Sequence, residues 1–224
     1  MTPPKPIKIH PSVLCADHGN LSQAIRHLSQ EADYFHMDVM DGSFVPNFAI
    51  GAEIFKIVRQ NSAVPLDVHL MIREPSRHVA FFRELGAEII TIHPEADTQL
   101  AATLAQIRKL GATAGIALNP GTSVETVKEV LPLCGHVLAM TVNPGFAGQD
   151  FLEFTVEKIK ELGKLSEKHG FALCVDGNIN AERVRQLHPL GVTNFVIGTA
   201  LFKDEPVEMM RAIKGHCPFS PTDL

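Results

Sequence analysis

The chain has 224 residues, of which 45% are hydrophobic and 20% charged, and its 20 Lys and Arg against 25 Asp and Glu give a formal net charge of −5. This composition is typical of a folded protein and argues against intrinsic disorder. The acidic balance, without a long basic run, argues against nucleic acid as a partner. No apolar stretch is long enough to span a membrane, which argues against a membrane protein.

Eight short apolar segments, in chain order, predict buried β-strands. They cover residues 7–14, 34–39, 66–71, 88–93, 114–118, 137–142, 172–175 and 194–197. Between them lie segments with helical spacing of apolar residues, such as Leu21, Ile25 and Leu28. Helix ends are indicated by Gly86, Gly111, Gly170 and Gly191 after such segments and by Ser123 and Asn180 before them.

Eight alternating β/α units with nearly continuous apolar strands predict a closed parallel barrel, the (β/α)8 or TIM barrel, over the alternative of an open doubly wound sheet. No linker divides the chain, so we expect one domain over residues 1–224, with short tails at 1–6 and 216–224. In such a barrel the chemistry lies at the carboxyl ends of the strands.

Polar side chains interrupt three of the predicted strands. His36 and Asp38 share one face of their strand because side chains alternate along a strand, and Asp67 and His69 share a face in the next. Asp176 ends the seventh predicted strand. A single His or Asp in a strand is more often a hydrogen-bonded structural group. Four that converge on one mouth, namely His36, Asp38, His69 and Asp176, predict a site for a divalent transition metal.

Two further carboxylates have open interpretations. Asp67 lies deeper than His69, either orienting a metal ligand or hydrogen-bonding within the core. Asp41 is expected to support the turn at Gly42.

Small residues after the sixth, seventh and eighth predicted strands indicate an anion site. The first loop contains Gly145, Phe146, Ala147 and Gly148, and the others contain Gly177-Asn178 and Gly198-Thr199. Small side chains let backbone N–H groups approach a phosphate, and barrels commonly bind phosphate beside the last two strands. Each glycine pair alone is more often a simple turn.

Several other residues near strand ends remain ambiguous. Met40, Met71 and Met140 either fill the core or line a site. The segments 93–95 and 119–120 lie where they could contact a substrate, and residues 44–47 form either a lid or a packed loop. The four cysteines have no C-x-x-C pair, which favours buried reduced thiols at Cys15, Cys134, Cys174 and Cys217.

Five ordered motifs resemble the ribulose-phosphate 3-epimerase family of metal-dependent (β/α)8 barrel enzymes. They are His10-Pro11-Ser12-Val13-Leu14, residues 36–42 with 44–47, residues 66–71, residues 142–149 and Val175-Asp176-Gly177. The resemblance extends from about residue 9 to residue 202. It implies an isomerase that interconverts D-ribulose 5-phosphate and D-xylulose 5-phosphate through a metal-stabilised enediolate.

The resemblance also implies roles for individual residues. It assigns His36, Asp38, His69 and Asp176 as metal ligands, with Asp38 and Asp176 as the acid/base pair. The substrate contacts it implies are Ser12, His69, Gly145, Phe146, Ala147, Gly148, Gly177, Asn178, Gly198 and Thr199. The metal is expected to be zinc, with Fe(II), Mn and Co as alternatives that imidazole and carboxylate ligands also accept.

Two alternatives to this activity stay open. Asn178, where the family often has a second Gly, and the His93-Pro94-Glu95 segment resemble the allulose 6-phosphate 3-epimerase branch, which would change the substrate. A catalytically silent sugar-phosphate-binding protein is a third hypothesis, but binding alone needs no base on each face of a sugar. We expect a cytoplasmic protein, because residues 1–6 lack the apolar segment of a secretory signal. We also expect a homo-oligomer, because exposed helix faces of such barrels often associate.

Overall fold

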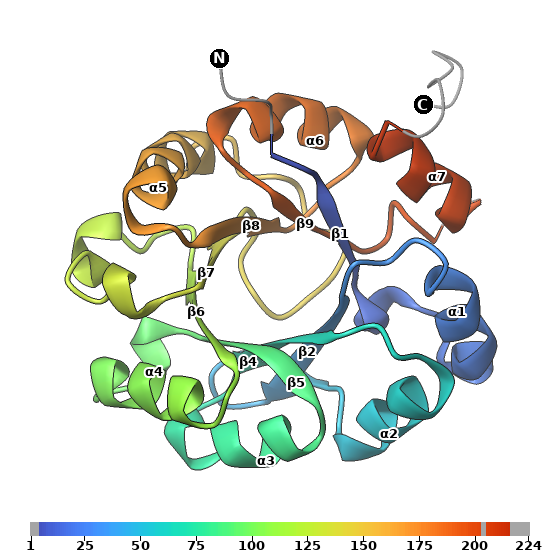
Figure 1. The fold of residues 1–224 in the computed structure, drawn as a ribbon, viewed down its shortest axis with the longest axis horizontal. Coiled ribbons are helices and arrows are strands. Elements are labelled where there is room, and N and C mark those ends of the chain that lie inside the picture. The colour runs from blue at the N-terminus through green and yellow to red at the C-terminus, as the bar shows by residue number, and fades with distance from the viewer. Residues whose placement is uncertain (1–4, 203–204, 216–224) are drawn as a thin grey trace.

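The β-strands form a ring that the helices surround (Figure 1). The computed structural model describes residues 5–202 and 205–215. Most of the two expected tails, together with Cys217, therefore lies outside the described residues. The strands are β1 (Lys8–Pro11), β2 (Phe35–Asp41), β3 (Phe48–Ala49), β4 (Leu66–Met71), β5 (Ala87–Ile92), β6 (Thr113–Leu118), β7 (His136–Met140), β8 (Ala172–Asp176) and β9 (Asn194–Ile197).

The sheet closes into a barrel. Successive strands pair in parallel from β2 through β4 to β9, and β9 pairs with β1. Between β1 and β2, a parallel bridge from Ser12 to His36 completes the ring. The short strand β3 pairs antiparallel with β2 outside this pattern. The predicted barrel is confirmed, and the open-sheet alternative is wrong.

Helices follow most strands and cover the outside of the ring. The α-helices are α1 (Leu21–Leu28), α2 (Ala52–Asn61), α3 (Val79–Glu84), α4 (Leu100–Lys109), α5 (Thr155–His169), α6 (Ala181–Leu187) and α7 (Pro206–Ile213). The 3-10 helices are η1 (Val13–Cys15), η2 (His18–Asn20), η3 (Pro75–Arg77), η4 (Pro94–Ala96), η5 (Val124–Val127), η6 (Leu131–Leu133) and η7 (His188–Leu190). Gly170 ends α5 in a left-handed conformation, and the Asn180 side chain caps α6 through the Arg183 N–H, as predicted.

The connection between β6 and β7 departs from the expected alternation of strand and α-helix. Two 3-10 helices, η5 and η6, take the place of an α-helix there. Pro132 lies in η6, and a proline within an α-helix lacks the N–H and clashes with the carbonyl four residues earlier. The proline therefore breaks the segment into two short turns.

Three strand ends differ by two or more residues from the sequence-based prediction, and one short strand was not predicted. The segment predicted over 34–39 continues to Asp41. The segment predicted over 7–14 ends as a strand at Pro11, because the chain turns into η1 directly after the Ser12 bridge. The segment predicted over 137–142 ends at Met140, where the loop toward α5 begins. Strand β3 was not predicted, because two residues are too few to show a period.

Alternation along the strands separates an apolar exterior from a partly polar interior. In β2, Phe35, Met37 and Val39 belong to the apolar core beneath the helices. The intervening His36 and Asp38 therefore point into the barrel, where His36 is 0% and Asp38 5% exposed. The fold thus places titratable side chains inside the ring.

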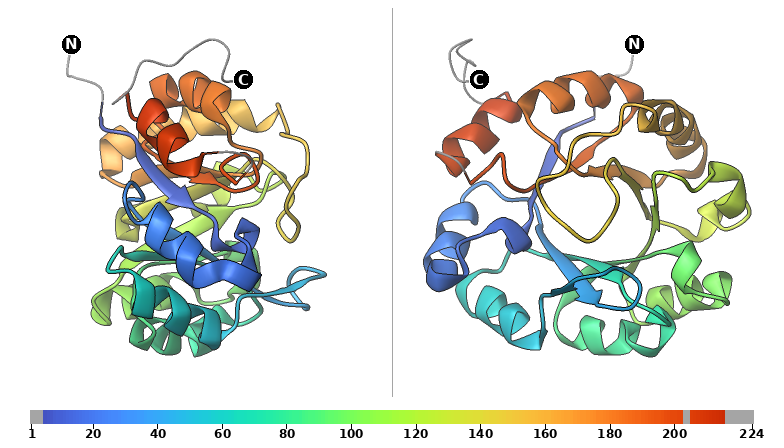
Figure 2. Two further views of the ribbon diagram at one scale, coloured as in Figure 1. Left: turned by 90° about the vertical axis from the view of Figure 1, so that its right-hand side faces the viewer. Right: turned by 180° about the vertical axis from the view of Figure 1, so that it is seen from behind.

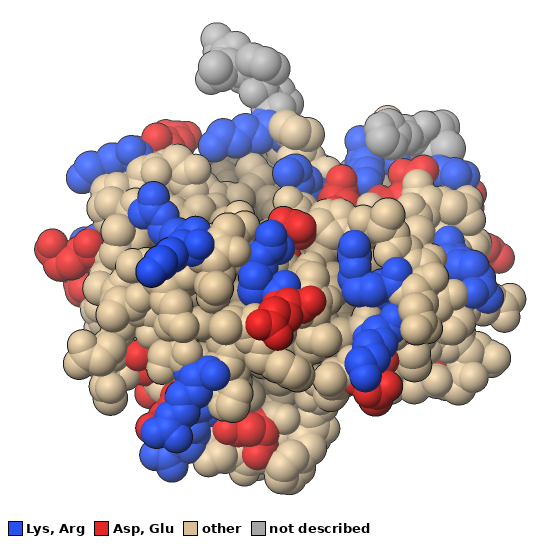
Figure 3. All heavy atoms as spheres, turned by 60° about the horizontal axis from the view of Figure 1, so that its bottom comes forward, with Lys and Arg blue, Asp and Glu red and all other residues tan. Residues whose placement is uncertain are grey.

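The outer surface carries charges of both signs. On the face shown in Figure 3, Lys and Arg side chains lie interspersed with Asp and Glu. Ion pairs within a helical turn join Lys56 with Glu53 and Arg77 with Glu74. Among the described residues, no helix is both long and apolar enough to cross a bilayer.

Candidate active site

A pocket of about 460 Å³ opens at the carboxyl end of the barrel. The β2–β3 hairpin and the loop after β7 project from this same end (Figure 2). The pocket is lined by these residues predicted for the site: Ser12, Asp38, Met40, Met71, Met140, Gly145, Phe146, Ala147, Gly148, Asp176, Gly177, Asn178, Gly198 and Thr199. Two further predicted site residues, His36 and His69, are not among the lining residues and are fully buried.

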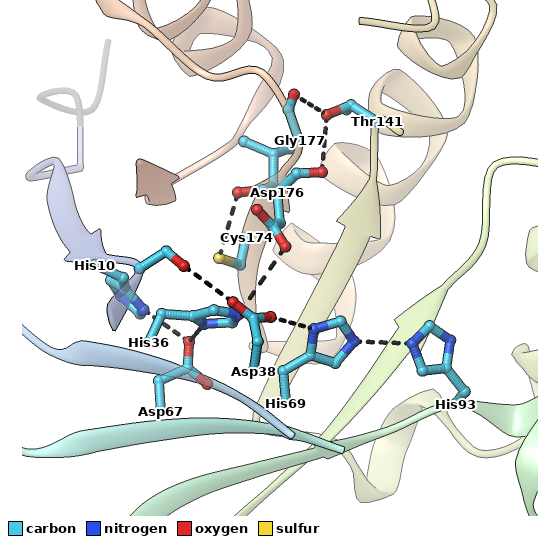
Figure 4. Close-up of polar contacts among 12 residues, drawn as sticks. His10, His36, Asp38, Asp67, His69, His93, Thr141, Cys174, Asp176 and Gly177 are labelled. Carbon is cyan, nitrogen blue, oxygen red and sulfur yellow. Dashed lines mark hydrogen bonds and ion pairs between the residues drawn. The ribbon is translucent and has the colours of Figure 1, made fainter. Parts of the chain in front are cut away.

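The four predicted metal ligands converge in the barrel interior (Figure 4). The register of β2 and β4 pairs Asp38 with His69, and β8 ends at Asp176. One ligand atom from each of the four residues lies within 4.8 Å of the others. The Asp38 Oδ1 is 3.2 Å from His36 Nε2 and 3.3 Å from His69 Nδ1, and the Asp176 Oδ2 is 4.0 Å from His36 Nε2.

In each of the two candidate histidine ligands, the contact made by one ring nitrogen determines which nitrogen faces the cluster. His36 Nδ1 lies 2.8 Å from Asp67 Oδ2, and the buried Nε2 has no hydrogen-bond partner among the described residues. His69 Nε2 lies 2.8 Å from His93 Nε2, so its Nδ1 faces the cluster. Two imidazole nitrogens and two carboxylates that face one point are a donor set for a divalent transition metal, so the residues fit such an ion.

Asp67 is resolved as a partner of a metal-ligand candidate. Its Oδ2 accepts from the Nδ1 atoms of both His36 and His10, each at 2.8 Å. The opposite nitrogen of His10 lies 2.9 Å from the Asn194 side-chain nitrogen. Since all of these groups are buried, the network fixes the orientation of His36. Asp67 therefore hydrogen-bonds within the core, as one interpretation expected, and one of its partners is a candidate metal ligand, as the other expected.

The two carboxylates in the cluster have opposite electrostatic environments. Burial and the neighbouring Asp38 raise the pKa of Asp176 to about 7. Burial acts in the same direction on Asp38, but His36 outweighs it and holds the pKa of Asp38 well below its usual range. Burial likewise opposes protonation of His36, yet Asp38 and Asp67 raise the pKa of His36 well above its ordinary value. Around neutral pH, one carboxyl is ionised while the other titrates.

The predicted anion loops meet on one side of this pocket. Gly145, Gly148 and Gly177 have φ of 124°, 79° and 120°, which is the region that favours glycine. A Cβ on Gly177 would lie 2.7 Å from Val142 and 2.8 Å from the Thr141 hydroxyl. Asn178 follows with φ of 51°, a left-handed conformation that Asn tolerates. Among the described residues that line the pocket there is no Lys or Arg, so a phosphate bound to them would depend on backbone N–H groups.

The residues with open interpretations are now placed. Met40, Met71 and Met140 are almost fully buried and also line the pocket. Asp41 accepts from the N–H groups of Ser43 and Phe44, as expected of a carboxylate that supports the turn.

The ambiguous loops after the strands mostly lie away from the pocket. Residues 44–47 do not line the pocket but pack beside it, since Val45 is 3% exposed and the Asn47 side chain donates to the Gly145 carbonyl at 2.7 Å. Residues 93–95 and 119–120 do not line the pocket. Substrate contact through those last two segments is therefore not supported.

Two sets of contacts in the site could not be read from the sequence. The Thr141 hydroxyl lies 2.8 Å from the Asp176 carbonyl and 2.6 Å from the Gly177 carbonyl, and it fixes the end of β8. His93 contacts His69, which its place after a different strand did not reveal. Both threonine and histidine occur at many strand ends, so only the register of the barrel identifies these contacts.

Comparison with known proteins decides the family. Residues 8–202 match the family model described as the ribulose-phosphate 3 epimerase family. The chain belongs to this family. A ribulose-phosphate 3-epimerase from Bacillus subtilis is 41% identical over 200 residues, covering 88% of this chain and 92% of that protein. One from Helicobacter pylori is 40% identical, covering 93% of this chain and 96% of that protein.

Solved structures support the fold alone. KGPDC from Streptococcus mutans superposes with a TM-score of 0.71 at 14% identity, covering 94% of this chain and 97% of that one. A mutant tryptophan synthase alpha-subunit from Pyrococcus furiosus superposes with a TM-score of 0.70 at 14% identity, covering 95% and 98% of the two chains. The barrel is therefore shared well beyond the epimerase family.

Proposed function

We propose that this epimerase-family protein is an isomerase that interconverts D-ribulose 5-phosphate and D-xylulose 5-phosphate by inverting C3. The observation that carries the proposal is geometric: Asp38 and Asp176 both line one pocket, and their carboxylate oxygens lie 3.2 Å and 4.0 Å from the same atom, His36 Nε2. Inversion beside a carbonyl removes a proton from one face of the carbon and returns one to the other. An ionised and a protonated carboxyl at one site match this need.

In one direction, the Asp38 carboxylate first takes the proton from C3, and the protonated Asp176 carboxyl then donates its proton to the opposite face of the same carbon. The substrate passes through an enediolate, and the two side chains exchange protonation states. The reverse reaction uses Asp176 as the base. The Ser12 hydroxyl donates to Asp38 Oδ2 at 2.9 Å, which holds that carboxylate in place during the transfer.

The residues proposed to hold the cation are His36, Asp38, His69 and Asp176. A divalent ion held there supplies Lewis-acid stabilisation of the negative charge that develops when C3 loses its proton, worth several kcal/mol. Zinc is our first choice, with Fe(II), Mn and Co as alternatives, since imidazole and carboxylate ligands suit all of them.

Binding of the sugar phosphate is assigned to the remaining pocket residues. The phosphate and adjacent sugar oxygens would bind to Gly145 to Gly148, Gly177, Asn178, Gly198 and Thr199. This contact would anchor the sugar phosphate so that its C3 lies over the two carboxylates. Met40, Met71 and Met140 would border the reacting carbons and limit access of water, whereas His69, which does not line the pocket, would act only through the cation. The pocket volume lies within the range usual for small-molecule sites.

The expected cytoplasmic location also remains a proposal. It is supported by the cysteines, since Cys15, Cys134 and Cys174 are all free thiols, as expected in a reducing compartment.

The test is exchange of solvent deuterium into C3, measured with ribulose 5-phosphate on metal-loaded protein. We expect exchange and xylulose 5-phosphate formation by the wild type, with losses of about 10²- to 10⁴-fold in Asp38→Asn and Asp176→Asn at equal metal content. Glu53→Gln, on the exposed face of α2, is the control and should behave as wild type. Parallel turnover of allulose 6-phosphate identifies the hexulose alternative. Binding of both sugars without any exchange would instead identify a binding protein.

A further inference from the structure

The loops after β5 and β6 lie at the mouth of the barrel but contribute no residue to the pocket lining. A row of polar side chains nevertheless connects them to the metal-ligand cluster. His69 Nε2 contacts His93 Nε2 at 2.8 Å, and His93 Nδ1 lies 3.6 Å from Glu95 Oε2. Figure 4 shows the first part of this row, from Asp38 through His69 to His93.

Proton positions along this row follow from the cluster. When the lone pair of His69 Nδ1 faces a cation, Nε2 carries the proton and donates it to His93. His93 Nε2 must then accept, which leaves the His93 proton on Nδ1. That atom is buried and lacks a closer partner among the described residues, and it points toward the Glu95 carboxylate.

Both members of the row are held in place. His93 is 0% exposed, and its ring packs between the rings of Phe44 and His69, with centroid separations of 4.8 Å and 4.9 Å. The Thr122 hydroxyl, from the loop after β6, donates to Glu95 Oε1. The same loop is also tied to α5. Lys158 of that helix donates to the Asn119 and Pro120 carbonyl groups of the loop, at 2.5 Å and 2.8 Å.

We propose that His93 and Glu95 are positioning residues that hold His69 with Nδ1 toward the bound cation. The loops after β5 and β6 would then help to retain the metal, whereas the loops after β7, β8 and β9 would bind the substrate. The inference rests on the metal site of the proposed function. For His36, the carboxylate that orients the ring is Asp67, which contacts it directly. For His69, the carboxylate of Glu95 acts through the His93 imidazole.

The test compares three variants in their affinity for Zn(II), measured by competition with a chromophoric chelator in the absence of substrate. His93→Leu removes the acceptor for His69 Nε2–H, and we expect affinity to fall by about 10- to 100-fold. His93→Gln can place its amide oxygen where Nε2 lies, and it should recover affinity to within about threefold of wild type. Glu95→Gln keeps an acceptor but loses the charge, and should fall between the two.

A second readout separates positioning from packing. In Co(II)-substituted protein, the visible absorption bands should shift in His93→Leu and return in His93→Gln, because only the former changes the ligand geometry. At saturating metal, the KM for sugar phosphate should stay within about twofold of wild type, since neither residue lines the pocket. Glu88→Gln, at an exposed position on β5, is the matched control and should leave metal affinity unchanged.

Wild-type zinc affinity and an unshifted Co(II) spectrum in His93→Leu, with only a lower melting temperature, would overturn the proposal and leave a packing role. Unchanged affinity in Glu95→Gln would remove Glu95 from it. If His93→Leu does not fold, Glu95→Gln decides: a fall in zinc affinity supports the proposal, and unchanged affinity then overturns it, since this side chain is partly exposed in η4 and its replacement should not disturb folding. Since no measurement of affinity depends on turnover, failure of the proposed epimerase activity is distinguishable from failure of this inference.

Discussion

Replacing His136 by Leu should stabilise the metal-free protein, and more so in acid. His136 begins β7 with its side chain in the barrel, where it is 1% exposed. Neither ring nitrogen has a hydrogen-bond partner among the described residues. A buried polar group left without a partner costs about 1–3 kcal/mol, and an apolar side chain of similar size removes that cost. We therefore expect a gain of about this size in the free energy of unfolding at pH 7.

Protonation adds a second, pH-dependent contribution. Burial lowers the pKa of His136 from 6.5 to about 4. Between these values the unfolded chain binds a proton that the folded chain does not, so this histidine reduces stability as the pH falls. The reduction amounts to about 0.2 kcal/mol at pH 7 and about 2 kcal/mol at pH 5. The difference in free energy of unfolding between His136→Leu and the wild type should thus grow by about 2 kcal/mol from pH 7 to pH 5.

Urea unfolding of both proteins at pH 7 and pH 5, after removal of metal, measures this difference. His27→Leu is the control for replacing a histidine by leucine, because His27 is exposed on α1, outside the barrel interior. A His136→Leu protein that is less stable than wild type at both pH values, with the same pH dependence, would refute the reasoning. It would mean that the imidazole is protonated or bound to a group that satisfies it.

Three further predictions concern the fold, the mouth and the metal. Gly163→Ala should lower the free energy of unfolding by about 3 kcal/mol, because the new Cβ would lie 1.9 Å from the Leu190 carbonyl oxygen. Thermal melting measures the loss, and a loss below about 0.5 kcal/mol would contradict the prediction. Asn47→Ala should raise the KM for sugar phosphate about fivefold with kcat nearly unchanged, because it removes the hydrogen bond that holds the Gly145 carbonyl. Steady-state kinetics measure both constants, and a fall in kcat alone would contradict this prediction. Exhaustive chelation should abolish turnover and Zn, Mn, Co or Fe(II) should restore it, whereas full activity in metal-free protein would rule out a catalytic ion.

The barrel and its four candidate ligands were accessible from the sequence for local reasons. Strand segments such as 66–71 and 194–197 are short, apolar and bounded by turns, so their limits agree with β4 and β9. Period-two alternation places His36 and Asp38 on one face without knowledge of the tertiary structure. The rule that sites lie at the carboxyl ends of barrel strands then brings Asp176 to the same mouth.

The partners of these ligands were not accessible, because they depend on long-range register. His10 and His36 meet at one Asp67 oxygen across three different strands, and no local pattern specifies that meeting. The His93 contact with His69 depends likewise on the stagger of neighbouring strands. The break between η5 and η6 could have been anticipated, since Pro132 already argues against a continuous α-helix there.

The closure of the ring between β1 and β2 links folding to ligation. Backbone pairing across this seam rests on the bridge from Ser12 to His36, and the Ser12 hydroxyl donates to Asp38 of β2. The His10 side chain reaches one strand further, to Asp67 of β4. The groups that join the first strand to its neighbours are thus among those proposed to hold or orient the cation. Occupancy by an ion should protect the amides of β1 from hydrogen exchange, so that the apoprotein loosens first at its amino-terminal strand.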